Sequence, residues 1–222
     1  MTDRNQIHSD WPRLFRIACN LIDQVNADQC IIRYWSLGGG TAMMLQIAHR
    51  ESHDVDIFFE DPQVLPFLNP DTHDFTYEIT PSEYKGDGTT HLKFSFEKIG
   101  EIDFIVAPHL TTNPTTKRDV ENVSVFLETL PEIIAKKICH RGHRITPRDI
   151  FDLAAASRVC RDDIVTALSD YPEQARASLS YMEQLSHAFV KDAISELMIR
   201  VEYQHLVESS LEEARALLSA VR

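Results

Sequence analysis

A glycine-rich turn followed at short range by two paired acidic residues most constrains how this chain can fold. The turn is L-G-G-G-T-A at residues 37–42, and D-V-D-I follows at residues 54–57. Such a turn joins a strand to a helix, and its backbone N–H groups form a site for an anion such as phosphate. Residues 55–59 alternate in polarity, which predicts a strand with Asp54 and Asp56 on one face.

Asp54 and Asp56 are candidate ligands of a divalent metal ion, because two carboxylates on one strand face repel each other unless a cation lies between them. Mg²⁺ accepts carboxylate and phosphate oxygens together, and phosphoryl-type transfer often uses two such ions. Asp103 lies in another predicted strand, where burying a lone charge is costly without a metal or a donor. We predict these three as catalytic, metal-binding residues. The alternative is that they are solvent-exposed residues of half-buried strands.

The predicted elements divide the chain into two parts of different type. Residues 11–25 and 41–49 have helical patterns, whereas strands are expected at 31–36, 55–59, 75–79, 91–97, 102–107 and 123–127. T-L-P-E at 129–132 reads as a capping box, and helical patterns then run almost to the end. The predicted fold is α+β, with a mixed sheet and flanking helices in residues 1–128 and a helical C-terminal bundle in residues 129–222.

Composition limits the partners that the chain can have. The formal net charge of the 222 residues is −12, which disfavours a general nucleic-acid coat because non-specific binding depends on Lys and Arg contacts to phosphate. We expect no signal peptide and no membrane span, because apolar runs of the required length are lacking. The four cysteines are scattered, which is typical of reduced thiols in a cytoplasmic protein.

A basic segment at residues 136–148 differs from this acidic background. Its cations are Lys136, Lys137, Arg141, Arg144 and Arg148. Lys137, Arg141 and Arg144 are spaced four and three residues apart, which places them on one face of a helix. The segment can bind triphosphate or RNA phosphates. It can equally be a solvated helix face whose cations favour a helix C-terminus.

Together, G-G-G-T at 38–41, D-V-D-I at 54–57 and I-D-F-I at 102–105 resemble the polymerase-beta-like nucleotidyltransferase superfamily. More narrowly, G-G-T-A at 39–42 and H-R-E-S at 49–52 resemble the AbiEii/AbiGii toxin-type nucleotidyltransferases. That family also carries a Lys and an Arg-Asp-x-x-Asp motif, and Lys137 and R-D-I-F-D at 148–152 stand in those places. The resemblance covers about residues 35–155. Gly38 departs from the family, in which a Lys or another residue is common.

The resemblance implies transfer of a nucleoside monophosphate from an NTP to an acceptor hydroxyl with Mg²⁺ or Mn²⁺, and Asp54, Asp56 and Asp103 as catalytic residues. The substrate-binding residues that it suggests, together with the glycine turn, are Gly39, Gly40, Thr41, Arg50, Ser52, Lys137, Arg148, Asp149 and Asp152. Asp149 also fits a capping residue of the helix that starts after T-P at 146–147. A toxin or phage-defence enzyme, a cognate antitoxin, and tRNA or another RNA as acceptor are implied as well.

Two alternatives stay open. A small-molecule nucleotidyltransferase of the aminoglycoside-modifying kind fits the acidic charge, because a cationic antibiotic would be attracted to the protein. A non-catalytic binding protein could retain the same fold as a scaffold, although the presence of all three carboxylates argues against it.

Overall fold

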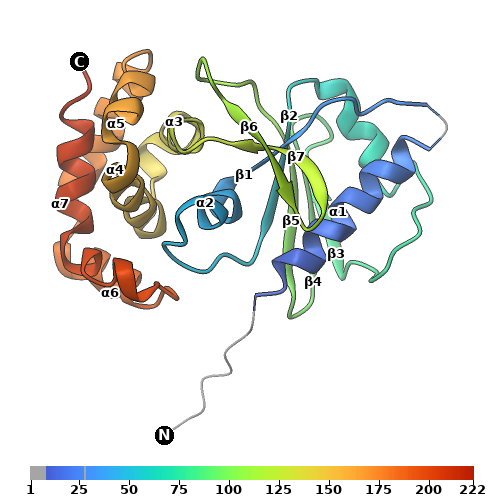
Figure 1. The fold of residues 1–222 in the computed structure, drawn as a ribbon, viewed down its shortest axis with the longest axis horizontal. Coiled ribbons are helices and arrows are strands. Elements are labelled where there is room, and N and C mark those ends of the chain that lie inside the picture. The colour runs from blue at the N-terminus through green and yellow to red at the C-terminus, as the bar shows by residue number, and fades with distance from the viewer. Residues whose placement is uncertain (1–8, 28) are drawn as a thin grey trace, which may run out of the picture. The chain divides into compact units, whose positions relative to one another are not determined.

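The computed structural model describes residues 9–27 and 29–222, and these form two compact units (Figure 1). The first unit contains the described residues of Met1–Ala42 together with Ser52–Pro108 and Lys117–Leu127. The second contains Met43–Glu51, His109–Thr116 and Glu128–Arg222. Each unit therefore combines segments that are distant in the sequence. Among the described residues, no helix is both long enough and apolar enough to cross a membrane.

A mixed seven-stranded sheet organises the first unit. Its strands are β1 (Ser36–Gly38), β2 (Val55–Phe59), β3 (Glu83–Gly86), β4 (His91–Phe96), β5 (Gly100–Val106), β6 (Thr115–Val120) and β7 (Val123–Glu128). They lie in the order β3-β4-β5-β2-β1-β7-β6. β2 runs parallel to β5 and antiparallel to β1, while β1 and β7 are parallel. The predicted mixed sheet is confirmed.

The two faces of the central strands differ in polarity because successive side chains alternate. Val55, Ile57 and Phe59 of β2 are buried, as are Ile102 and Phe104 of β5. Helix α1 (Trp11–Val25) packs against β2 and β5 (Figure 1). The intervening positions of these strands carry the carboxylates of Asp56, Glu101 and Asp103 together with the apolar side chains of Phe58 and Ile105.

Several predicted boundaries in the first unit are wrong. Residues 75–79, all of them described, form no strand, because the side chain of Gln24 accepts a hydrogen bond from the Thr76 N–H (2.8 Å) and donates one to its carbonyl (2.9 Å). The edge strand beside β4 is β3 instead. Residues 31–36 contribute only their last residue to β1, and β6 was not predicted because its sequence, T-T-K-R-D-V, lacks alternation. Residues 62–68 form a 3₁₀ helix, η1 (Pro62–Leu68).

The second unit is helical, as predicted. Its main helices are α3 (Leu130–Arg141), α4 (Pro147–Leu168), α5 (Pro172–Glu183), α6 (His187–Ser195) and α7 (Leu206–Leu218). Two short 3₁₀ turns, η2 (Gly142–Arg144) and η3 (Val201–Tyr203), lie between them, and α2 (Gly39–Ile47) enters this unit from the glycine turn. Helix α4 packs against α3, α6 and α7, and its N-terminal half is almost fully buried.

The capping box predicted at Thr129 and Glu132 is wrong, although α3 does begin there. The Thr129 hydroxyl donates to the Asn113 carbonyl (3.0 Å), and the Glu132 carboxylate accepts the N–H groups of Leu110 (3.0 Å) and Thr111 (2.9 Å). Glu132 therefore fixes a connecting segment rather than its own helix. The capping box of this unit lies at the start of α4, between residues 146 and 149.

Candidate active site

Strands β2 and β5 bring the three predicted carboxylates to the polar face of the sheet. Asp56 and Asp103 are in-register partners on these parallel strands, and adjacent strands lie about 4.8 Å apart. Asp54, two residues before Asp56, faces the same side, and its Oδ1 accepts a hydrogen bond from the Glu101 N–H at 3.2 Å. The register of β2 and β5 thus places on one face residues that are distant in sequence.

The glycine turn makes room for one of these carboxylates. Gly39 has φ +64°, and a Cβ at this position would lie 1.8 Å from Oδ2 of Asp56. The Asp56 carboxylate therefore lies against the backbone at the start of α2, where only glycine leaves enough space. Gly40 and Thr41 are buried, and the Thr41 hydroxyl donates to the carbonyl of Asp54. The turn and the carboxylate pair form one packed arrangement, and its role as a phosphate cradle stays a prediction.

Asp103 is held from the other side by two residues of β4 that the sequence reasoning missed. Nε2 of His91 lies 2.6 Å from Oδ1 of Asp103, and Nζ of Lys93 lies 3.5 Å from Oδ2. Lys93 also binds Oε2 of Glu101 at 2.5 Å. Burial lowers the pKa of Lys93, but the hydrogen bond to Glu101 and the charge of Asp103 raise it above its usual value overall. The alternation in H-L-K-F-S-F at residues 91–96 could have predicted that His91 and Lys93 share one face of a strand. It could not have predicted that this face lies next to Asp103, because that depends on the pairing of β4 with β5.

Asp54 and Asp56 fit a divalent metal by the chemistry of their oxygens, because Mg²⁺ is commonly bound through one or two carboxylates together with phosphates and water. His91 and Lys93 approach the two oxygens of Asp103, and its role as a third metal ligand stays a prediction. Within the described part of the chain, no three His, Cys, Asp or Glu side chains are grouped so that they could hold a metal ion. Metal binding by Asp54 and Asp56 therefore stays a prediction.

A buried ion cluster in the second unit contains most of the other predicted site residues. Nε and Nη2 of Arg50 bind Oδ1 and Oδ2 of Asp152 at 2.7 and 2.9 Å, and Nε2 of His49 lies 2.9 Å from Oδ1. Nζ of Lys137 lies 3.0 Å from Oδ2 of Asp152. Arg50 is also fixed by a backbone bridge to Ile199. Burial favours the neutral form of Asp152, but the charges of Arg50 and Lys137 bring its pKa well below the usual value.

Asp149 completes this cluster. Its oxygens bind Nζ of Lys137 at 2.7 Å and Nη1 of Arg141 at 2.9 Å. Burial favours the protonated form, yet these two cations lower the pKa of Asp149. Its carboxylate also accepts the Thr146 N–H at 3.1 Å in the capping box of α4. The structure thus confirms the capping role of Asp149, and the ion cluster is hereafter His49, Arg50, Lys137, Asp149 and Asp152.

The basic segment is only partly exposed. Lys136 is 5% exposed and its Nζ lies 2.6 Å from Oε1 of Glu128, so the prediction that it contributes to a basic surface is wrong. The sequence could not show this, because Glu128 and Lys136 meet only when β7 leads into α3. Arg141, Arg144 and Arg148 are exposed and remain the cations of this surface.

Ser52 is the remaining predicted substrate-binding residue. It is buried in the first unit, and its carbonyl accepts a hydrogen bond from the Ser9 hydroxyl at 2.5 Å. This position leaves its role toward substrate a prediction.

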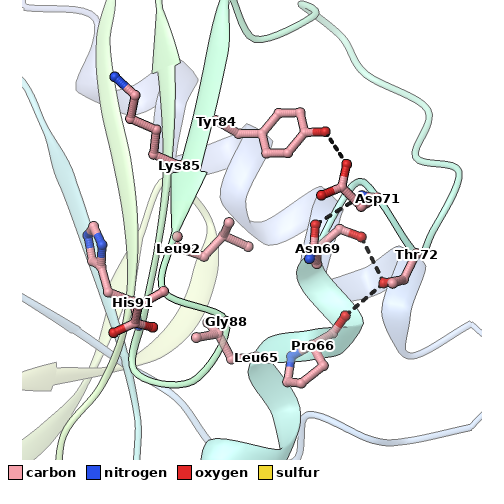
Figure 2. Close-up of a pocket in the computed structure, with 12 residues that line it drawn as sticks. Leu65, Pro66, Asn69, Asp71, Thr72, Tyr84, Lys85, Gly88, His91 and Leu92 are labelled. Atoms are coloured by element: carbon pink, nitrogen blue, oxygen red, sulfur yellow. Dashed lines mark hydrogen bonds between the residues drawn. The ribbon is translucent and has the colours of Figure 1, made fainter.

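A pocket of about 510 Å³ lies in the first unit between η1 and the β3–β4 hairpin (Figure 2). The Tyr84 hydroxyl donates to Asp71 at 2.5 Å on one wall. Figure 2 shows the imidazole of His91 and the side chain of Leu92 on opposite sides of β4. His91 and Leu92 both line the pocket, and Nε2 of His91 also lies 2.6 Å from Oδ1 of Asp103. The pocket therefore borders a residue that contacts one of the three carboxylates.

The chain matches the model of the AbiEii nucleotidyl transferase toxin family, of type IV toxin–antitoxin systems, over residues 32–220, and it belongs to that family. It is therefore a nucleotidyltransferase. The fold is similar to that of MenT4, a nucleotidyltransferase toxin from Mycobacterium tuberculosis H37Rv, with a TM-score of 0.51 and 15% identity over 94% of this chain and 84% of that one. JHP933 from Helicobacter pylori aligns with a TM-score of 0.48 and 13% identity over 96% and 92% of the two chains. No curated protein sequence matches the chain.

Proposed function

We propose that this nucleotidyltransferase transfers a nucleoside monophosphate from an NTP to a hydroxyl group of an RNA acceptor, with tRNA as the first candidate. The acceptor oxygen forms a bond to the α-phosphorus, the bond from that phosphorus to the bridging oxygen breaks, and pyrophosphate leaves. The acceptor proton is released in the same overall reaction. Family membership and the placement of Asp54 and Asp56 beside the glycine turn support this proposal.

In this proposal residues 1–128 perform the nucleotide chemistry. Asp54 and Asp56 hold Mg²⁺ or Mn²⁺, whose charge offsets that of the triphosphate when it is bound. Asp103 adds a third carboxylate on the same face. Gly39, Gly40 and Thr41 begin α2, and the N–H groups at a helix N-terminus can orient the phosphates.

In this proposal the helical residues 129–222 contribute further substrate-binding side chains. The ion cluster fixes Lys137, Asp149 and Asp152 in α3 and α4. Arg148, which is exposed at the start of α4, binds phosphate in this proposal. Membership in a toxin–antitoxin family supports a cognate antitoxin as partner. Because NTP, tRNA and an antitoxin are found in the cytoplasm, we infer that the enzyme acts there.

The decisive observation is the carboxylate pair, and the variant Asp56→Asn tests it. We expect transfer from radiolabelled NTP with Mg²⁺ and total tRNA to fall at least about a hundredfold, because loss of electrostatic stabilisation at the reacting phosphate is worth several kcal/mol. Asp74→Asn changes an exposed carboxylate of the same unit and is the matched control. Wild-type turnover by a folded Asp56→Asn protein would contradict the assignment.

The acceptor is tested separately with the exposed arginines. Arg144→Glu with Arg148→Glu should weaken tRNA binding and reduce the slope of log K against log salt, because each lost phosphate contact removes about one unit. The net charge of −12 favours instead a cationic small molecule such as an aminoglycoside. Transfer to the drug but not to tRNA would select that alternative. Lack of metal-dependent NTP consumption with any acceptor would point to a non-catalytic binding protein.

A further inference from the structure

Lys93 occupies an unusual position for a lysine. It lies on β4 directly opposite Asp103 in the antiparallel β4–β5 pair. Asp103 lies in turn directly opposite Asp56 in the parallel pair of β5 with β2. The row Lys93–Asp103–Asp56 therefore crosses three strands on one face, which places a positive charge two strands away from the proposed metal pair.

The contacts of Lys93 show that it acts as a counter-ion. Its Nζ lies 2.5 Å from Oε2 of Glu101 and 3.5 Å from Oδ2 of Asp103, and its side chain is 32% exposed. His91 takes the other oxygen of Asp103 at 2.6 Å. A metal ion that used Asp103 as a ligand would compete with these two groups, because both approach the same carboxylate.

We propose that Lys93 is a built-in counter-cation of the metal site, which holds Asp103 while the protein is free of metal and competes with the ion for that carboxylate. The inference rests on the proposed function, because it takes Asp54 and Asp56 as the metal ligands. Its consequence is weak binding of free metal, so that the ion enters mainly together with the triphosphate, whose oxygens supply ligands that the protein withholds.

Titration of the full chain with Mn²⁺ in the absence of NTP, followed by electron paramagnetic resonance of the free ion, tests this inference without reference to activity. We expect Lys93→Met to bind Mn²⁺ about tenfold more tightly, because loss of the Lys93 charge leaves the Asp103 carboxylate free to attract the ion, an electrostatic effect of about this order near a protein surface. Lys93→Arg, which keeps the charge, should stay within about twofold of wild type.

A matched control and a double variant separate this effect from a change in net charge. Lys85→Met removes the same charge from β3, where Lys85 is the register partner of Lys93 but is 73% exposed and pairs with Glu83. It should leave the affinity within about twofold, because the charge is far into solvent. Asp103→Asn should change wild-type affinity little, yet it should abolish the gain in the Lys93→Met background.

The inference is overturned if Lys93→Met binds Mn²⁺ no more tightly than wild type while its circular dichroism spectrum is unchanged. It is also overturned if Asp103→Asn alone weakens binding as much as Asp56→Asn, because Asp103 would then be a ligand outright. If Mn²⁺ binding survives Asp56→Asn undiminished, the proposed metal pair itself is wrong. Failure of the inference and failure of the proposed function are thus distinguishable.

Discussion

Replacement of Asp152 by Asn tests whether the ion cluster holds the helical unit together. Asp152 lies in α4 with its side chain 0% exposed. Its two oxygens receive two hydrogen bonds from Arg50 and one contact each from His49 and Lys137. Asn has nearly the same shape, so the substitution removes the charge and one acceptor without opening a cavity.

The expected loss of unfolding free energy is about 3 kcal/mol. Removing one partner of a buried ion pair typically costs about 3–5 kcal/mol, because the remaining charge stays desolvated without compensation. The lower end applies here for two reasons. Arg50 keeps a hydrogen bond to the Glu51 carbonyl at 3.0 Å, and Lys137 keeps Asp149 at 2.7 Å.

Urea denaturation followed by circular dichroism measures this loss. With a slope of about 2–3 kcal/mol per molar urea, the midpoint should fall by about 1–1.5 M. Asp162→Asn, an exposed change of the same kind in the same helix, should alter stability by no more than about 0.5 kcal/mol. A loss below about 1 kcal/mol for Asp152→Asn would refute the stabilising role of the cluster and would favour a role in substrate binding alone.

Three further expectations follow from single contacts. Gly39→Ala should abolish metal binding and activity, because its Cβ would lie 1.8 Å from Oδ2 of Asp56, whereas Gly88→Ala, with φ +77° but open space around it, should cost only about 1–2 kcal/mol of backbone strain. Equal effects in melting and Mn²⁺ titration would contradict the clash. Thr146→Ala should cost about 1 kcal/mol in urea denaturation, since the capping box of α4 is lost, and no measurable change would argue against it. The lowered pKa values of the two cluster carboxylates give stability that is complete above the unfolded value of about 3.9 and lost as pH falls through the folded values. The urea midpoint should therefore decrease when the pH is lowered below about 4. This decrease should be smaller in Asp152→Asn, and the same pH dependence in the variant and the wild type would disprove the linkage.

The sequence by itself determined the parts of the molecule that depend on local spacing. The glycine turn, the strand 55–59 with its two carboxylates and the helix 11–25 are all present, because periodicity and glycine conformation act over a few residues. The boundary errors arose where a distant group replaced a local preference. Gln24 bonds the backbone of Thr76, so a segment with strand-like alternation forms no ladder.

Only the tertiary structure decided which charges meet. The register of β4, β5 and β2 places Lys93 opposite Asp103 and Asp103 opposite Asp56. A shift of one residue would have moved every one of these side chains to the other face. Burial likewise turned Lys136 from an expected surface cation into the partner of Glu128. Sequence patterns specify which face is polar, but pairing between strands and helices far apart in the chain is settled by packing of the whole core.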